Sequence, residues 1–364
     1  MGRGPTTIRE ARFFEARSTL SQPIADATHA IPSIDFIVAD LLLDNGVRGQ
    51  GYLLAFHYSR HAIRGALRDL EPLLHGFDAA ATGGFIAAAE RENEYFGLEG
   101  LQRWAVGLAN VAMWDAWART LDVPMHRLFG QVRDSVPVYG SGGWLSYSDE
   151  ELLDEVRGYV RRGFGAVKVK VGSPDARRDV ERLRLVREAV GPQVRVMMDA
   201  NQGLDLAGAL ALARAAMPLG ITWFEEPLHH QDVAGYATLR RQCGISLAMG
   251  EREYDLQPLK ALVAADAIDL WQPDLLRLGS VEAWRASAAY AQAHRLPVLP
   301  HYYRDYDVPL LCGIANGLAA ESFDWIDALI DTPLEVSHGV ARPRTQPGWG
   351  FRFRESGLTE LRPS

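Results

Sequence analysis

GAVKVKVG, residues 165–172, alternates small or branched apolar residues with two lysines. Its alternation is typical of a strand, and side chains two positions apart on a strand share one face, so Lys168 and Lys170 should project together. A half-exposed strand with a polar outer face would explain the pattern if the stretch stood alone. The rest of the chain decides whether the two ammonium groups are buried.

Similar apolar or β-branched runs recur from about residue 135, and stretches with helical periodicity separate them. Strands that alternate with helices pair in parallel through crossover helices, and eight such units close into a TIM barrel. We therefore expect an α/β fold with a (β/α)8 barrel over residues 131–335. The eight runs are 136–142, 165–172, 194–201, 222–227, 246–251, 269–275, 297–302 and 319–323.

Residues 1–130 predict a separate α+β domain ahead of the barrel. An Asn-Gly turn at Asn45 separates two apolar runs, which indicates a hairpin. The last segment, 336–364, is rich in Pro, Gly and aromatic residues, and we expect it to pack back onto this first domain. The predicted helical stretches of the first domain are 61–75 and 101–120.

The chain has 364 residues, of which 48% are hydrophobic and 23% charged, and its net charge is −8. This composition is that of a folded protein, and the negative charge argues against nucleic-acid binding, which depends on clustered Lys and Arg. Because no signal peptide or membrane-spanning run is visible, we expect a cytoplasmic protein that acts on a small molecule. We also expect a homo-oligomer and two buried free thiols, Cys243 and Cys312.

Each predicted barrel strand from the second onward ends in a side chain that can do chemistry. In a TIM barrel the C-terminal ends of the strands form the floor of the active site, so these residues should converge. A helix N-cap or a solvated loop would explain any one of them, but not a series along the whole barrel. The series is Lys170, Asp199, Glu225, Glu251, Asp274, His301 and Glu321.

Asp199, Glu225 and Glu251 end three successive strands, so they should form an arc that points inward. Carboxylates in one site repel each other unless a cation lies among them. Ligation by oxygen alone favours Mg²⁺, with Mn²⁺ as a substitute. The sequence therefore predicts a metal site, and we expect the adjacent Glu226 to contact a neighbouring helix or loop.

Two further groups are candidates for acid/base chemistry. Lys170 is a candidate base, because the metal and Lys168 would both disfavour its protonated form and lower its pKa. Across the barrel, Asp274 should fix the tautomer of His301 and stabilise its protonated ring, which makes His301 the second acid/base group. Acid/base groups on both sides of a metal indicate abstraction of the α-proton of a carboxylate, with an enediolate that the metal stabilises.

Three polar residues are candidates for holding the substrate. Glu321 would hydrogen-bond a carboxylate oxygen if its own carboxyl group stays protonated. Asn201 and Ser141 are candidate donors to the hydroxyl or carboxylate of the substrate.

These motifs together resemble those of the enolase superfamily, and within it the mandelate racemase subgroup. The resemblance implies a modified, enolase-like TIM barrel under an N-terminal capping domain, with Mg²⁺ on the three carboxylates. It also implies that Lys170 and the Asp274–His301 pair are the acid/base groups and that Glu321 is the electrophilic acid. The motifs are KVK at 168–170, MMDANQ at 197–202, WFEEP at 223–227, MGE at 249–251, QPDLLRLG at 272–279, PHYY at 300–303, and Glu321.

By the same resemblance, capping loops choose the substrate, and here they are expected at 20–33 and 53–61. The first loop carries His29 among other polar residues, which suits a polyhydroxylated chain. The second resembles an aromatic-bearing loop through Phe56 and Tyr58.

Tyr303 and Arg304, which follow the predicted catalytic histidine, also favour a polar or anionic substrate. We therefore expect dehydration of an acid sugar to a 2-keto-3-deoxy acid, and racemisation or epimerisation of a 2-hydroxy acid stays open. Two other classes are alternatives. A non-catalytic sugar-acid binding protein would bind metal and ligand without proton exchange, and a divalent-metal hydrolase would usually include His among its ligands.

Overall fold

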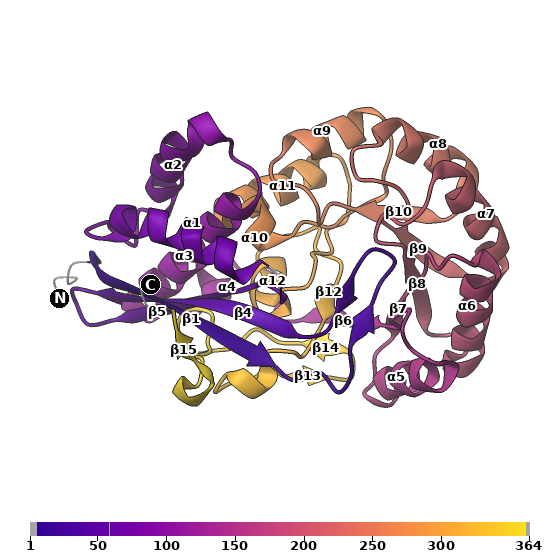
Figure 1. The fold of residues 1–364 in the computed structure, drawn as a ribbon, viewed down its shortest axis with the longest axis horizontal. Coiled ribbons are helices and arrows are strands. Elements are labelled where there is room, and N and C mark those ends of the chain that lie inside the picture. The colour runs from indigo at the N-terminus through magenta and orange to yellow at the C-terminus, as the bar shows by residue number, and fades with distance from the viewer. Residues whose placement is uncertain (1–5, 58, 362–364) are drawn as a thin grey trace.

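The computed structural model describes residues 6–57 and 59–361, which form a capping domain and a barrel side by side (Figure 1). Parallel strands β6 to β11 follow one another in chain order around the barrel, and β12 pairs with β6 to close it. The predicted (β/α)8 fold is therefore confirmed. The strands are β6 (Val136–Gly142), β7 (Ala166–Lys170), β8 (Arg195–Asp199), β9 (Ile221–Glu225), β10 (Ser246–Met249), β11 (Leu270–Trp271) and β12 (Ala320–Ser322).

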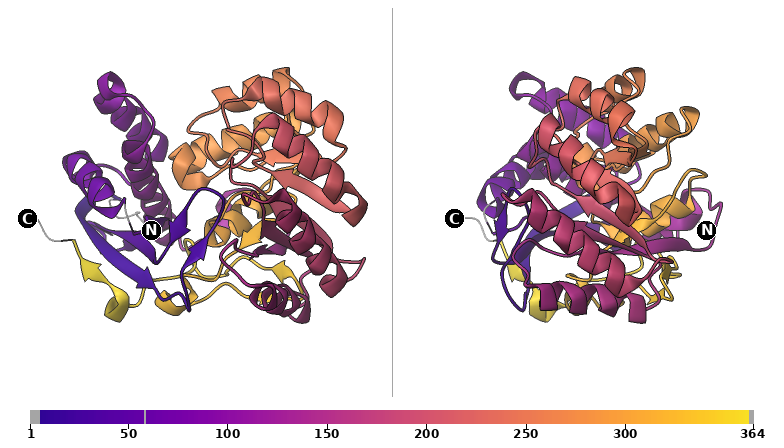
Figure 2. Two further views of the ribbon diagram at one scale, coloured as in Figure 1. Left: turned by 45° about the vertical axis from the view of Figure 1, so that its right-hand side comes forward. Right: turned by 90° about the vertical axis from the view of Figure 1, so that its right-hand side faces the viewer.

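The seventh predicted run, 297–302, departs from a regular barrel. It forms no strand of its own, and Val298 alone bridges Trp271 on one side and Gly317 on the other. Helices surround the barrel on its outside (Figure 2). They are α5 (Asp149–Arg161), α6 (Ala176–Val190), α7 (Leu206–Ala216), α8 (Val233–Cys243), α9 (Gln257–Ala264), α10 (Leu275–Leu278), α11 (Val281–Ala293) and α12 (Arg304–Cys312).

The capping domain is an antiparallel sheet, in the order β15-β1-β4-β5, packed against helices. The predicted hairpin joins β4 to β5, and Gly46 of its turn has a φ of +83°. Gly49 allows α3 to lie directly on β5, because a Cβ there would come within 2.4 Å of the Ala116 nitrogen. The elements are β1 (Ile8–Ser18), β4 (Ile34–Leu43), β5 (Arg48–Leu54), α1 (Arg60–Leu74), α2 (Thr82–Asn93) and α3 (Leu101–Thr120).

The C-terminal segment touches both domains. Its strands β13 and β14 pair beside β6 of the barrel, and β15 pairs with β1 of the cap. Between them, the Trp349 N–H donates to Asp115 on α3 at 2.8 Å. The short remaining elements are β2 (Ile24–Ala25), β3 (Ala30–Ile31), α4 (Met125–Leu128), β13 (Val336–Ser337), β14 (Val340–Ala341), β15 (Thr359–Glu360), and 3-10 turns at Glu94–Phe96, Met217–Leu219, Asp327–Leu329 and Glu355–Gly357.

The small β2–β3 hairpin carries the first predicted capping loop from the cap to the barrel. The Leu145 N–H, in the loop after β6, donates to the Ala25 carbonyl at 2.8 Å. At the hairpin tip, Ala27 packs on barrel glycines, because a Cβ on Gly172 would lie 3.0 Å from the Ala27 Cβ and one on Gly203 only 2.7 Å. The loop is therefore seated against the ends of the barrel strands.

A second tie joins the cap to α12. The hydroxyl group of Tyr303 accepts from the Leu54 N–H at 3.0 Å, and that of Tyr306 accepts from the Tyr52 N–H at 2.6 Å. Both thiols are buried and free, as expected. Within 6–57 and 59–361, no helix is long and apolar enough to cross a membrane.

Candidate active site

The strand-end residues meet at one cavity of about 270 Å³ between the barrel and the cap. Lys170 reaches it from β7, and His301 reaches it from the seventh segment, on the opposite side of the barrel by strand order. Side chains from the cap, including Asp26 and His29, complete the wall. Of the predicted series, Lys170, Glu251, Asp274, His301 and Glu321 line this cavity.

The two lysines of β7 are both buried, so the solvent-exposed interpretation of this strand is wrong. Lys168 is 2% exposed and donates to Glu321 at 2.7 Å, to Asp199 at 3.4 Å and also to Glu225. Lys170 is 6% exposed and donates to Asp199 at 2.6 Å. Lys168 thus lies beneath the cavity, and Lys170 opens onto it.

The predicted fall in the pKa of Lys170 is not what the protein side chains produce. Burial lowers this pKa, but the charge of Asp199 opposes it, and the net result is a raised pKa. Lys168 lowers the pKa of Lys170 by a smaller amount than Asp199 raises it. The prediction assumed that a divalent cation would lower the pKa of Lys170. Without that positive charge, the nearby carboxylates raise this pKa.

His301 and Asp274 form the predicted pair. The His301 Nδ1 lies 2.8 Å from the Asp274 Oδ2, and its Nε2 lies 3.5 Å from the Glu251 Oε2. Burial lowers the pKa of His301, but the charge of Glu251 and the bond to Asp274 outweigh it and raise that pKa from 6.5 to about 9. The imidazole is therefore held in place at one nitrogen and faces the cavity with the other.

Glu321 differs from the prediction of a protonated acid. Burial raises its pKa, but the charges of Lys168 and His301 lower it further, so that the net pKa is below the usual range. Its Oε2 also accepts from the Tyr302 N–H at 2.9 Å. Glu321 is therefore an ionised partner of Lys168, which reaches it from β7 although β6 lies between β7 and β12.

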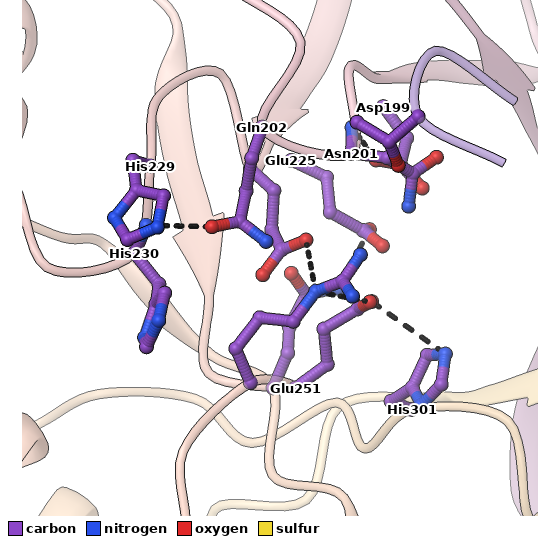
Figure 3. A network of polar contacts seen from close by, with 12 residues as sticks. Asp199, Asn201, Gln202, Glu225, His229, His230, Glu251 and His301 are labelled. Carbon is purple, nitrogen blue, oxygen red and sulfur yellow. Dashed lines mark hydrogen bonds and ion pairs between the residues drawn. The ribbon is translucent and has the colours of Figure 1, made fainter. Parts of the chain in front are cut away.

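The three predicted metal ligands are buried at the carboxyl ends of β8, β9 and β10, with exposures of 0% for Asp199 and Glu225 and 6% for Glu251. Lys168 contacts both Asp199 and Glu225, and each carboxylate also has a partner of its own. Glu225 accepts from Gln272 at 2.6 Å, whereas Glu251 lies 3.4 Å from the Arg252 guanidinium and faces His301, as Figure 3 shows. As positioned, no three His, Cys, Asp or Glu side chains in the described part of the chain surround one point closely enough to share an ion.

The chemistry of this donor set nevertheless fits a hard divalent cation. Burial, and the nearby charges of Asp199 and Glu251, raise the pKa of Glu225 to about 8. Negative charge is therefore in excess there even with Lys168 among the carboxylates. Oxygen donors that repel one another in this way are the ligands that Mg²⁺ takes in proteins.

Glu226, next in the chain, contacts a neighbouring loop, as expected from the sequence. It lies beyond the end of β9 with a φ of +37°, and it accepts from Arg252 at 3.2 Å, so that it contacts the loop after β10. Its other oxygen, Oε1, is buried without a hydrogen-bond partner among the described residues.

The predicted substrate-binding residues divide into two groups. Asn201, His29 and Phe56 line the cavity, and the Asn201 Oδ1 is buried with no partner in the described structure. Ser141 does not reach it, because it lines a separate cavity of about 100 Å³ behind β6.

Arg304 differs from the prediction as well, whereas Tyr303 does line the cavity. Tyr303 touches the cavity wall, but its hydroxyl group bonds to the cap backbone. Arg304 is 1% exposed and pairs with Asp327, which removes it from the site. Tyr58 lies outside the described residues.

Sequence reasoning treated Asp26 only as one of several polar residues of the first capping loop, and it gave no role to Trp144, Arg252 or Arg277, which also line the cavity. Asp26 is fixed by the N–H groups of Thr28 and His29, both at 2.7 Å, and burial raises its pKa while His29 and the charge of Lys170 lower it to a value below its usual range. Trp144 lies 5.3 Å from the Lys170 ammonium. Arg252 was signalled only by its position after Glu251, and Arg277 only by its place in the QPDLLRLG motif.

Comparison with known proteins agrees with this geometry. Residues 8–130 match the mandelate racemase / muconate lactonizing enzyme N-terminal domain family, and residues 151–357 match the enolase C-terminal domain-like family. The 3,6-anhydro-alpha-L-galactonate cycloisomerase of Streptomyces coelicolor is 29% identical over 346 residues, which cover 94% of this chain and 96% of that protein.

Two solved structures share the whole architecture. A racemase from Streptomyces coelicolor A3(2) with bound magnesium superposes with a TM-score of 0.91 at 28% identity, covering 95% of this chain and 97% of that one. The L-talarate dehydratase from Polaromonas sp. JS666, complexed with Mg and L-glucarate, gives 0.90 at 27% identity, with 98% and 100% covered. With family matches over both domains and a fold shared along the chain, this protein belongs to the mandelate racemase / muconate lactonizing enzyme family of the enolase superfamily.

Proposed function

We propose that this protein removes the α-proton of a sugar acid and expels the neighbouring hydroxyl group, giving a 2-keto-3-deoxy acid in a Mg²⁺-dependent reaction. One observation carries the proposal: Lys170 and the Asp274–His301 pair face one cavity from opposite sides, above a floor of buried carboxylates. That arrangement suits a carbon that loses a proton on one side while a leaving group is handled on the other.

Asp199, Glu225 and Glu251 would hold the metal, which supplies positive charge where negative charge develops on the substrate carboxylate. Lys170 removes the α-proton with its Nζ as the neutral amine, a form that a divalent cation held by Asp199 would favour by lowering the pKa of the lysine. Asp199 lies 2.6 Å from this Nζ and holds it in position. His301 donates a proton from Nε2 to the departing hydroxyl group, because Asp274 stabilises the protonated ring through Nδ1. Lys168 adds a buried positive charge below the reacting carboxylate.

The wall supplied by the cap favours dehydration over simple racemisation. Asp26 and His29 of the cap present polar groups to the cavity beside Asn201, which follows β8 of the barrel and whose Oδ1 still lacks a partner in the described structure. Polar groups of this kind suit a substrate with several hydroxyl groups, because a small apolar acid would leave them unpaired. The bound L-glucarate in the related dehydratase has the same chemical character.

Incubation with a panel of acid sugars tests the proposal, with keto-acid formation and solvent deuterium uptake as readouts. We expect formation of a 2-keto-3-deoxy product. This formation should stop when a chelator is added and resume when Mg²⁺ is restored. The variants Lys170→Met and His301→Asn should each lower turnover by roughly 10² to 10⁴, the usual contribution of a general acid or base. Unchanged turnover in chelator, or in both variants, would refute the mechanism.

Racemisation or epimerisation of a 2-hydroxy acid is the second candidate. The same two-sided geometry favours it, because proton removal on one side and return on the other inverts the carbon. Deuterium uptake with loss of optical rotation and no keto product, in a simple 2-hydroxy acid, would identify this reaction instead.

A further inference from the structure

Arg277 lies at the edge of the catalytic cavity and has no role in the reaction described above. It follows Asp274 on α10, and its guanidinium packs against two aromatic rings. The centroid of Trp104, on α3 of the cap, is 5.0 Å away, and that of Tyr254, in the loop after β10, is 5.4 Å away. Stacking against rings holds a planar cation in one orientation.

This guanidinium is not neutralised. Across residues 6–57 and 59–361, the Arg277 side chain forms no ion pair and no hydrogen bond, and its Nε is buried without a partner. Arg252, on the same wall, contrasts with it, because Arg252 is already paired with Glu226 at 3.2 Å and Glu251 at 3.4 Å. A half-buried guanidinium with five N–H donors binds an anion favourably.

Arg277 also stands where two cavities join. It lines the catalytic cavity together with Lys170 and His301, and it lines an adjoining cavity of about 830 Å³. The residues common to both walls are His29, Asn201, Arg252, Tyr254 and Arg277. A substrate with its reacting carboxylate at the floor therefore has room to extend its other end past Arg277.

We propose that Arg277 binds a second carboxylate, so that the substrate is a sugar diacid with a carboxylate at each end. The inference rests on the proposed function, since it assumes that the reacting end lies on the carboxylate floor. A carboxylate matches the planar guanidinium with two parallel hydrogen bonds, whereas a terminal hydroxymethyl group would leave the charge unpaired. The relatives leave this choice open, because one is named for 3,6-anhydro-alpha-L-galactonate, a monoacid, and another holds L-glucarate, a diacid.

A purely structural role makes a different prediction. If Arg277 only joined the cap to the barrel through Trp104 and Tyr254, replacing it would impair every substrate to the same degree. Binding of a second carboxylate would impair diacids alone. The two roles are therefore separated by substrates that differ only at the far end.

The experiment compares galactarate with galactonate, and glucarate with gluconate, as matched pairs. Wild-type protein should prefer the diacid of at least one pair by about tenfold or more in kcat/KM, the size expected for a hydrogen-bonded charge pair. Arg277→Met, which keeps an apolar stem against the two rings, should abolish that preference and change use of the monoacid by less than about threefold. Arg277→Lys should restore part of it. Arg285→Met is the control, because Arg285 also packs on a ring, Phe129 at 5.4 Å, but lines neither cavity.

Binding separates failure of this inference from failure of the proposed reaction. Calorimetric titration of the same acids into Lys170→Met with Mg²⁺ requires no turnover, and diacids should bind at least about tenfold more tightly than their monoacid partners. That preference, lost in Lys170→Met/Arg277→Met, supports the inference even if no acid is converted. Equal affinity for the two members of every pair, absence of diacid binding, or an equal loss for both in the Arg277 variant overturns it.

Discussion

Glu155 carries a proton over a pH range in which most carboxyl groups have lost theirs. Its carboxylate accepts from the Gly143 N–H beneath the loop after β6, and burial raises its pKa from 4.5 to about 7. In the unfolded chain the group ionises near 4.5, so the folded state binds more protons between the two values. The free energy of unfolding should therefore fall as pH rises from about 4.5 to about 7.

The variant Glu155→Gln should remove this dependence. Its amide oxygen still accepts from Gly143, but it has no charge to bury, so at pH 8 the variant should be more stable by about 2 kcal/mol after allowance for partial exposure. At pH 4 the two proteins should be equally stable. Urea denaturation over this pH range measures the difference, and parallel curves for the two proteins would contradict the assignment.

At the residue scale, the sequence could predict which groups converge but not their charge states. Lys170, Asp274 and His301 were predictable because parallel strands present their ends on one side of a barrel. The ionised state of Glu321 was not, because it depends on Lys168 reaching across from β7. The free charge of Arg277 was hidden for the same reason, since only the three-dimensional neighbours show which cations are left unpaired.

At the element scale, the position of the β2–β3 hairpin depends on two glycines of the barrel. Ala27 at its tip packs against Gly172 and Gly203, and a Cβ on Gly203 would lie 2.7 Å from the Ala27 Cβ. Asp26 and His29, which flank this contact, line the catalytic cavity. The position of the hairpin is therefore coupled directly to the shape of the site.

The variant Gly203→Ala should displace the hairpin while leaving the barrel folded. Because misplacement by about 1 Å can reduce catalysis by about 10²-fold, we expect kcat/KM to fall between about tenfold and a hundredfold. Gly165→Ala is the matched control, since a Cβ there meets nothing within 4 Å. Unaltered kinetics in Gly203→Ala, with thermal stability also unchanged, would show that the hairpin does not shape the site.

Element boundaries could be predicted where a local sequence pattern defines the element, but not where the element depends on pairing with a distant segment of the chain. The β4–β5 hairpin and the helices over 61–75 and 101–120 were read correctly from the turn at Asn45 and from periodicity. Strand β1 was missed, because its charged residues alternate irregularly and its pairing partner β4 lies after an intervening loop. The seventh barrel run looked like the others in sequence but keeps only the Val298 bridges.

At the scale of the whole molecule, Asp115 joins the cap helix α3 to the returning C-terminal segment and to β5. It is fully buried and accepts from the N–H groups of Gln50 and Trp349 and from Arg119, at 2.9, 2.8 and 2.6 Å. One carboxylate therefore satisfies donors from three separate parts of the chain.

The variant Asp115→Ala should lower the free energy of unfolding by about 3 to 5 kcal/mol, because it removes the carboxylate from the half-buried Arg119 guanidinium and from two buried N–H groups. Glu188→Ala on α6 is the control, since it removes only an exposed pair with Arg184 and should change little. Chemical denaturation of the purified proteins measures both, and equal effects would contradict a special role for Asp115.

The hydrogen bonds that the backbone N–H groups of β5 donate to the hydroxyl groups of Tyr303 and Tyr306 limit how this architecture can be recombined. The residues that follow His301 are hydrogen-bonded to β5 of the capping domain. The position of His301 therefore depends partly on the sheet of the cap, which takes no part in the chemistry. A chimera that combines the cap of one relative with the barrel of another would bring together residues of α12 and β5 that do not match at this contact between the domains. Exchange of specificity between such enzymes should succeed only when α12 and β5 are transplanted together.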